Sequence, residues 1–154
     1  MALDTETHGT HHRVVVTGVG ALSAIGNNVS ENWEAAIAGK SGIAPITRFD
    51  ASDFPTTFAG EVKGFDPAAE VGKKEARRLD RYSQFAIAAT REAVKTSGLE
   101  IAEIAERVGV LIGTGMGGIE TFETGTENLL NGGPRRVSPF FVPMFLANMA
   151  SGNV

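Results

Sequence analysis

The sequence predicts an α/β fold with a largely parallel sheet, and two observations support this prediction. Two aliphatic runs, residues 14–18 and 107–113, each lead into a glycine-rich loop, as strands buried on both faces of a parallel sheet do. An alanine-rich stretch of helical character, ending at Gly98, lies between them. Strands that alternate with helices are typical of α/β proteins.

Composition restricts the possible functions. The 154 residues suffice for one domain, and 42% apolar with 21% charged residues is typical of a globular protein. The formal charge of −4 provides no overall positive field for nucleic acid. The absence of cysteine excludes disulfides, zinc–thiolate sites and a cysteine nucleophile within these residues. No run of about 18 apolar residues is present, so we predict no membrane-spanning helix.

Residues 1–12 are predicted to form a flexible N-terminal arm. They are polar and contain no apolar core of a secretory signal. His8, His11 and His12 are metal-ligand types, but three histidines on a loose segment are expected to be solvated. We therefore predict no metal site in this arm.

The first predicted helix runs from Glu31 to about Ala38. Ser30 is expected to cap it, because a serine oxygen can accept from the free amides of the first turn. Acidic residues follow in that turn, where they interact favourably with the helix dipole. Gly39 is expected to end the helix.

Residues 40–69 are predicted to form a long excursion from the α/β core. Prolines at three positions argue against any long element there. We expect only short strands, near residues 46–50 and 58–63.

After Gly72 the sequence predicts a helix that ends at Gly98. Its many alanines allow a neighbouring backbone to approach closely, so we expect this helix to be buried. The second buried strand, residues 107–113, is followed by a polar helix over about residues 118–130. A loop over residues 131–143 then leads into an apolar, helix-compatible segment that reaches the last residue without a visible cap.

The glycine loop after the second strand raises the question of nucleotide binding. Gly113, Gly115 and Gly118 have the G-x-G-x-x-G spacing of dinucleotide-binding folds. That site also needs an acidic residue about 20 positions further on, yet the last acid is Glu127. A weaker match near Gly18 is followed by an intervening loop and does not open a helix. We therefore favour close backbone packing as the reason for Gly113 and Gly115.

Five segments together resemble the β-ketoacyl-(acyl-carrier-protein) synthases, the condensing enzymes of bacterial fatty-acid synthesis, and type II fits best. The resemblance extends from about Arg13 to Val154. The segments, in chain order, are RVVVTGVGALSAIGN, ENWEAAIAGKSGI, FAGEVKGFD, VGVLIGTGMGG and NGGPRRVSPFFVP.

This resemblance implies a thiolase-like fold, an α-β-α-β-α layered sandwich, and a homodimer. Residues 13–154 would form part of the N-terminal half, truncated before the nucleophile. The implied reaction is a decarboxylating Claisen condensation between an acyl thioester and malonyl-carrier protein. The family's catalytic cysteine and two histidines have no counterpart here, so we assign no catalytic residue and expect this chain alone to be inactive. We expect no cofactor, no nucleic-acid or membrane partner, and a cytoplasmic location.

Two positions match the family's acyl pocket. Met116 falls where an aliphatic side chain lines the pocket, and an unbranched thioether suits chains of different length. The alternative is an ordinary core methionine. Phe141 matches the residue that reaches across the dimer to close the partner's pocket, the alternative being simple interface packing.

Five cations match or neighbour the family's docking positions for acyl carrier protein. A local basic patch would steer an acidic carrier towards a net-negative enzyme. The alternative is a solvated helix face. These cations are Lys74, Arg77, Arg78, Arg135 and Arg136.

Two further hypotheses remain open at the level of sequence. One is a non-catalytic chain-length-factor relative that pairs with an active subunit in polyketide synthesis. The other, disfavoured by the missing acid, is a small dinucleotide-binding domain.

Overall fold

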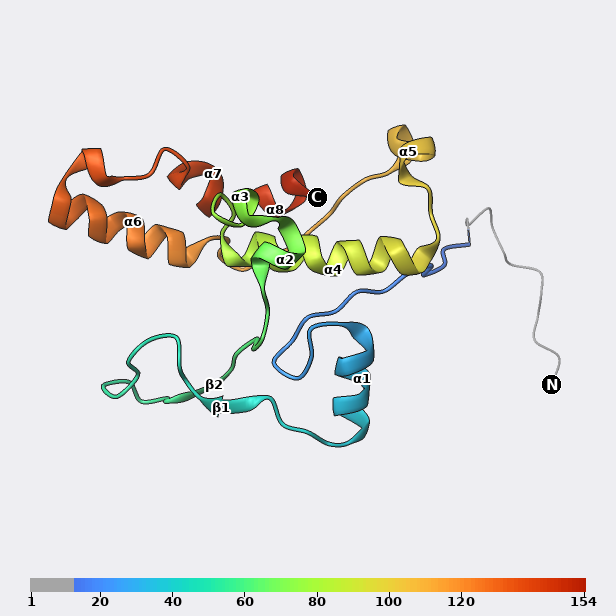
Figure 1. Ribbon diagram of the computed structural model, residues 1–154, viewed down its shortest axis with the longest axis horizontal. Coiled ribbons are helices and arrows are strands. Elements are labelled where there is room, and N and C mark those ends of the chain that lie inside the picture. The colour runs from blue at the N-terminus through green and yellow to red at the C-terminus, as the bar shows by residue number, and fades with distance from the viewer. Residues whose placement is uncertain (1–12) are drawn as a thin grey trace, which may run out of the picture.

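The computed structural model describes residues 13–154 of the chain (Figure 1). The predicted arm of residues 1–12, with His8, His11 and His12, lies outside the described residues. Two helices, α4 (Arg81–Ser97) and α6 (Ile119–Gly132), follow one another along the long axis.

The remaining elements are short. The helices are α1 (Val29–Ile37), α2 (Pro67–Val71), α3 (Lys73–Ala76), α5 (Ile101–Ile104), α7 (Phe141–Phe145) and α8 (Met149–Asn153). The 3-10 helices are η1 (Ala105–Arg107) and η2 (Pro134–Arg136). The strands are β1 (Ile43–Pro45) and β2 (Phe58–Gly60). Helices α2, α3, α7 and α8 gather near the point where α4 and α6 meet, while α1, β1 and β2 lie to one side. In the described part of the chain no helix has the length and apolar character needed to cross a bilayer.

The two strands predicted at residues 14–18 and 107–113 are not paired, and the prediction that they are buried is wrong. Val14 is 91% exposed and Leu111 98% exposed. The sheet seen within residues 13–154 consists of β1 and β2, antiparallel, with Ile43 opposite Gly60. A strand requires a neighbour that accepts and donates its backbone hydrogen bonds, and neither segment has one among these residues.

The helix predictions are confirmed in part. The stretch predicted as one helix from Gly72 to Gly98 forms two, α3 and α4, separated by residues 77–80, and α2, α5 and the start of α7 were not predicted. α1 begins at Val29, and its N-cap is Asn28, whose side chain accepts from the Glu31 amide at 2.9 Å. Ser30 lies inside the helix instead. The predicted strand near residues 58–63 overlaps β2, whereas the one predicted at 46–50 is wrong, because β1 forms just before it.

Helix α4 accepts close backbone neighbours, as predicted. A Cβ added at Gly18 would lie 2.0 Å from the Ala93 carbonyl oxygen, and one at Gly20 would lie 1.8 Å from that of Ala89. The segment before α1 can therefore follow α4 only because these two positions are glycines. Gly98 ends α4 in a left-handed conformation, φ +67°.

The loop between residues 18 and 29 is held onto α4 by Glu92. Its carboxylate accepts from the Ala21 amide at 3.0 Å and from the Val29 amide at 2.8 Å. Asn32 adds donors from inside α1, to the carbonyls of Ala21 and Gly26. The loop is thus fixed by side chains that are distant in sequence.

Replacing Glu92 by alanine should destabilise this loop by about 2 kcal/mol, because two charge-assisted hydrogen bonds to backbone amides are lost. Measured in the folded protein, amide hydrogen exchange should be faster at Ala21 and Val29, the two donors. Lys95→Ala, also on α4 but exposed, is the control and should leave both amides as protected as before. Unchanged protection in Glu92→Ala would contradict this role.

Candidate functional site

The glycine loop, residues 113–118, joins the second extended segment to α6. A Cβ added at Gly113 or Gly115 would meet nothing within 4 Å, so the expectation of close packing at these two glycines is wrong. The close approaches occur at Gly117 and Gly118. There an added Cβ would lie 2.6 Å from the Phe145 carbonyl oxygen and 2.5 Å from that of Met144, respectively.

The cause is the end of α7 and the turn that follows it, which together cross the start of α6. The Gly118 amide donates to the Phe145 carbonyl at 3.0 Å. Gly117 has φ +71°, a region that glycine enters without strain. These two glycines therefore let two backbone segments meet, which no local sequence pattern could reveal.

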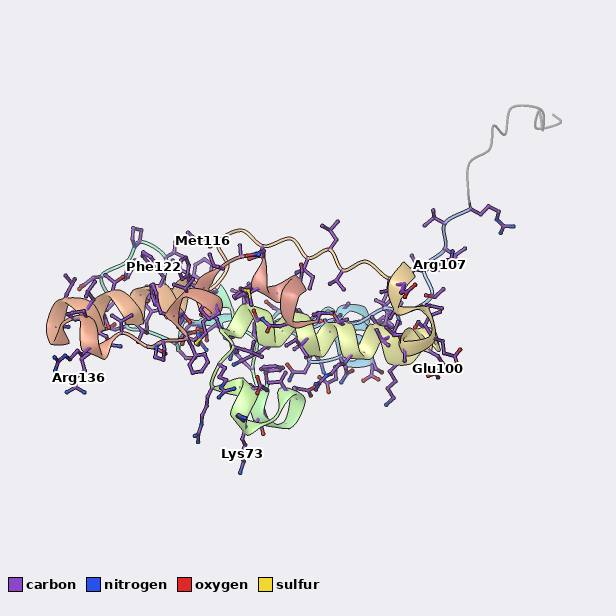
Figure 2. All side chains as sticks on the ribbon, turned by 90° about the horizontal axis from the view of Figure 1, so that it is seen from above. Lys73, Glu100, Arg107, Met116, Phe122 and Arg136 are labelled. Carbon is purple, nitrogen blue, oxygen red and sulfur yellow. The ribbon has the colours of Figure 1, made fainter. Side chains whose placement is uncertain are left out.

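Met116 lies in this loop, just before the close contact. Its side chain is 73% exposed within the described residues, and Figure 2 shows it where the loop enters α6. An exposed methionine on a fixed loop offers a flexible apolar surface to a further group.

Phe141 packs against α6 of its own chain. An added Cβ at Gly125 would lie 2.3 Å from the Phe141 ring, so this glycine makes room for it. The ring also belongs to an aromatic cluster, with centroids 5.1 Å from Phe145 and 6.1 Å from Phe122. The structure does not bring Met116 into the cavity that Phe141 lines.

That cavity, of about 440 Å³, lies between α4, α6 and α7. Arg48 forms an ion pair with Glu120 at its edge, which ties the long excursion to α6. Arg81 lies over the Phe85 ring, 4.7 Å from its centroid. Burial, and then the nearby Arg48, lower the pKa of Arg81. The residues that line this cavity include Arg48, Arg77, Asp80, Arg81, Thr121 and Phe141.

Three of the predicted docking cations lie together. Lys74 belongs to α3, Arg77 is its C-cap and Arg78 follows. The Arg78 guanidinium lies 4.9 Å from the centroid of the Phe140 ring and 3.9 Å from Glu75. We call the cavity of about 510 Å³ at this place the basic surface; it is lined by Lys73, Lys74, Arg77, Arg78 and Phe140.

Arg135 and Arg136 form the second basic spot, in η2 just after α6. Figure 2 shows Arg136 at the far end of α6 and Lys73 on the same side of the molecule. The chain from η2 leads to Phe140, which contacts Arg78. Phe140 thus contacts the first spot and lies four residues after Arg136 of the second along the chain. The sequence did not lead us to assign Phe140 or Lys73 to the docking region, although Lys73 is the neighbour of the predicted docking residue Lys74.

The family model described as "Beta-ketoacyl synthase, N-terminal domain" matches residues 11–154. The chain belongs to the β-ketoacyl synthase family.

Curated relatives of this β-ketoacyl synthase chain are similar over nearly its whole length. The 3-oxoacyl-(acyl-carrier-protein) synthases 2 of Staphylococcus aureus (strain COL) and Coxiella burnetii are each 54% identical over 143 residues. These residues are 92% of this chain but 34% of each relative. The chain therefore spans about a third of the length of the curated relatives it matches.

Solved structures confirm the predicted thiolase-like fold class. The ishigamide ketosynthase/chain length factor is 32% identical, with a TM-score of 0.75 over 90% of this chain and 35% of its own. A β-ketoacyl synthase from Burkholderia phymatum is 25% identical, with a TM-score of 0.74 over 91% and 35%. A type II polyketide ketosynthase, in complex with its acyl-carrier protein and bound to the hexaketide, is 25% identical, with a TM-score of 0.71 over 90% and 38%.

Proposed function

We propose that the protein carrying this chain is a β-ketoacyl-acyl-carrier-protein synthase of fatty-acid elongation. The observation that carries the proposal is 54% identity to 3-oxoacyl-(acyl-carrier-protein) synthase 2 over 92% of the chain. In the proposed reaction an acyl group moves from the carrier thiol to an enzyme cysteine. Malonyl-carrier protein then loses CO2, and the resulting enolate attacks the acyl thioester and releases the cysteine thiolate.

This chain would contribute binding rather than catalysis. The sequence contains no cysteine, so the nucleophile must come from residues other than these. The basic surface, with Arg135 and Arg136, would receive the acidic face of an acyl carrier protein. Support comes from the similar polyketide ketosynthase, which was solved with its acyl-carrier protein, and from the cations that gather on a chain of net charge −4.

Two side chains would shape the acyl pocket. Met116 would touch the acyl chain from the glycine loop, since its side chain is exposed there. Phe141, positioned by its packing on Gly125 and Phe145, would approach the pocket of the partner protomer in a homodimer. Both roles rest on the family positions that these residues match.

The proposal is tested with the protein extended to the length of its curated relatives. Incubation with an acyl-carrier protein thioester and malonyl-carrier protein should yield one 3-oxoacyl product and one CO2 per turnover, measured by mass spectrometry and ¹⁴CO2 release. A protein that condenses only when paired with an active ketosynthase would be a chain-length-factor relative, a candidate supported by the ishigamide neighbour. Thermal stabilisation by NADH without condensation would overturn both.

A further inference from the structure

A buried carboxylate, Asp80, lies between the basic surface and the glycine loop. Asp80 is 7% exposed. Its Oδ1 accepts from the Tyr82 amide at 3.4 Å and so caps α4. Its Oδ2 accepts from both the amide and the hydroxyl of Thr121, at 3.0 and 2.6 Å, in the first turn of α6. One carboxylate thus joins the N-termini of the two longest helices.

Within residues 13–154, Asp80 has no cationic partner within ion-pair distance. Its charge is stabilised by amides, a hydroxyl and the positive ends of α4 and α6. A buried charge held this way is costly to disturb, because any movement leaves it without compensation. The distance between the two helix starts is therefore closely defined.

On one side, Asp80 lies close along the chain to the arginines of the basic surface. It follows Arg78 by two residues and Arg77 by three. The Gln84 side chain donates to the carbonyls of Ala76 and Leu79, both at 2.9 Å. The segment that carries the arginines is thereby fastened to the first turn of α4.

On the other side, Asp80 touches the glycine loop. A Cβ added at Gly118 would lie 2.9 Å from Asp80 Oδ2, and Met116 precedes Gly118 by two residues. Tyr82, beside Asp80, donates from its hydroxyl to the Leu146 carbonyl in the turn that contacts this loop. The carboxylate thus lies where the loop, α4, α6 and the α7–α8 turn meet.

We propose that Asp80 and Thr121 are positioning residues that hold the basic surface and the glycine loop at a fixed mutual distance and orientation. This inference rests on the proposed function. An acyl chain tethered to a docked carrier reaches the pocket only if the docking site and the pocket wall keep that geometry. A free thioester has no such requirement. Loss of the Asp80–Thr121 hydrogen bonds should therefore slow acyl transfer from the carrier but not from a free thioester, because the proximity and orientation of the carrier-borne acyl group are lost.

The test uses the protein extended to the length of its curated relatives, called the family-length enzyme below. It follows the acyl-transfer half-reaction, in which the enzyme thiol gains the acyl group and the donor thiol is released. Thr121→Val removes the hydroxyl donor at nearly constant volume. We expect it to lower kcat roughly 10-fold for the carrier-borne acyl group, with KM unchanged, since docking itself is intact. The same acyl chain on N-acetylcysteamine should lose less than about 2-fold.

Three further variants complete the experiment. Thr121→Ser keeps the hydroxyl and should restore the wild-type preference for the carrier. Asp80→Asn should reproduce Thr121→Val, because its amide cannot accept on both sides. Thr126→Val is the matched control, since among residues 13–154 the Thr126 hydroxyl bonds only to the Phe122 carbonyl of its own helix.

Equal losses with both thioesters, or no loss with either, would overturn the positioning role. Failure of the wild-type enzyme to accept either thioester would instead remove the proposed function, and this inference with it. The two failures are thus distinguished by the unmodified enzyme.

Discussion

Expressed by itself, the 154-residue chain should not form a monomer that unfolds cooperatively. The extended segments around Val14 and Leu111 expose both their apolar side chains and their unpaired backbone groups. A cavity of about 720 Å³ opens between these segments and α4, lined largely by apolar atoms. Unpaired strands with exposed apolar residues associate with one another.

We expect the isolated chain to bind a hydrophobic dye, to lack near-UV circular dichroism and to elute as aggregates on size exclusion, the signs of poorly packed tertiary structure. The protein extended to the length of its curated relatives is the control and should show a sharp thermal transition. A monodisperse 154-residue monomer with a single cooperative transition would show that these segments are stable without partners.

Reversing two charges of the predicted docking region should strongly weaken the use of carrier-borne substrates. In the family-length enzyme, Arg77→Glu combined with Arg135→Glu replaces one cation by an anion at each of the two basic spots. We expect KM for the acyl-carrier protein substrate to rise about 10- to 100-fold, because like charges now oppose an acidic partner. The effect should shrink at high salt, which screens exposed charges.

Lys95→Glu with Arg107→Glu is the matched control, with the same change in total charge at the other end of α4. Figure 2 shows Arg107 far from Lys73 and Arg136. This control should leave KM for the carrier substrate within about 2-fold of wild type, since screened charges act over roughly 10 Å at 0.1 M salt. An unchanged KM in the Arg77/Arg135 variant, with turnover intact, would exclude docking at these residues.

Much of the helical structure was predictable from sequence, because helix signals are local. Gly98 ends α4 as expected, and α6 lies within a few residues of its predicted bounds. The prediction that Ser30 caps α1 was wrong by two residues, because the cap is Asn28 and both residue types can accept from a first-turn amide. The resemblance to the β-ketoacyl synthases and the basic residues were also evident from sequence alone.

Strand pairing and close contacts were decided by the tertiary structure. Residues 14–18 and 107–113 have the composition of buried strands, but pairing depends on a partner strand that composition does not reveal. An added Cβ at Gly113 or Gly115 would meet no neighbour, while Gly117 and Gly118 meet the backbone of the end of α7 and of the turn after it. Nothing within five residues of either glycine indicates that turn.

The sequence by itself determined the family, the approximate bounds of α1 and α6, the end of α4, and the identity of the cations and of Met116. Only the tertiary structure placed Phe140 under Arg78 and joined Asp80 to Thr121, 41 positions away. The physical reason is that periodicity and capping act between neighbours along the chain. Burial and long-range hydrogen bonds depend on which distant segments the fold brings into contact.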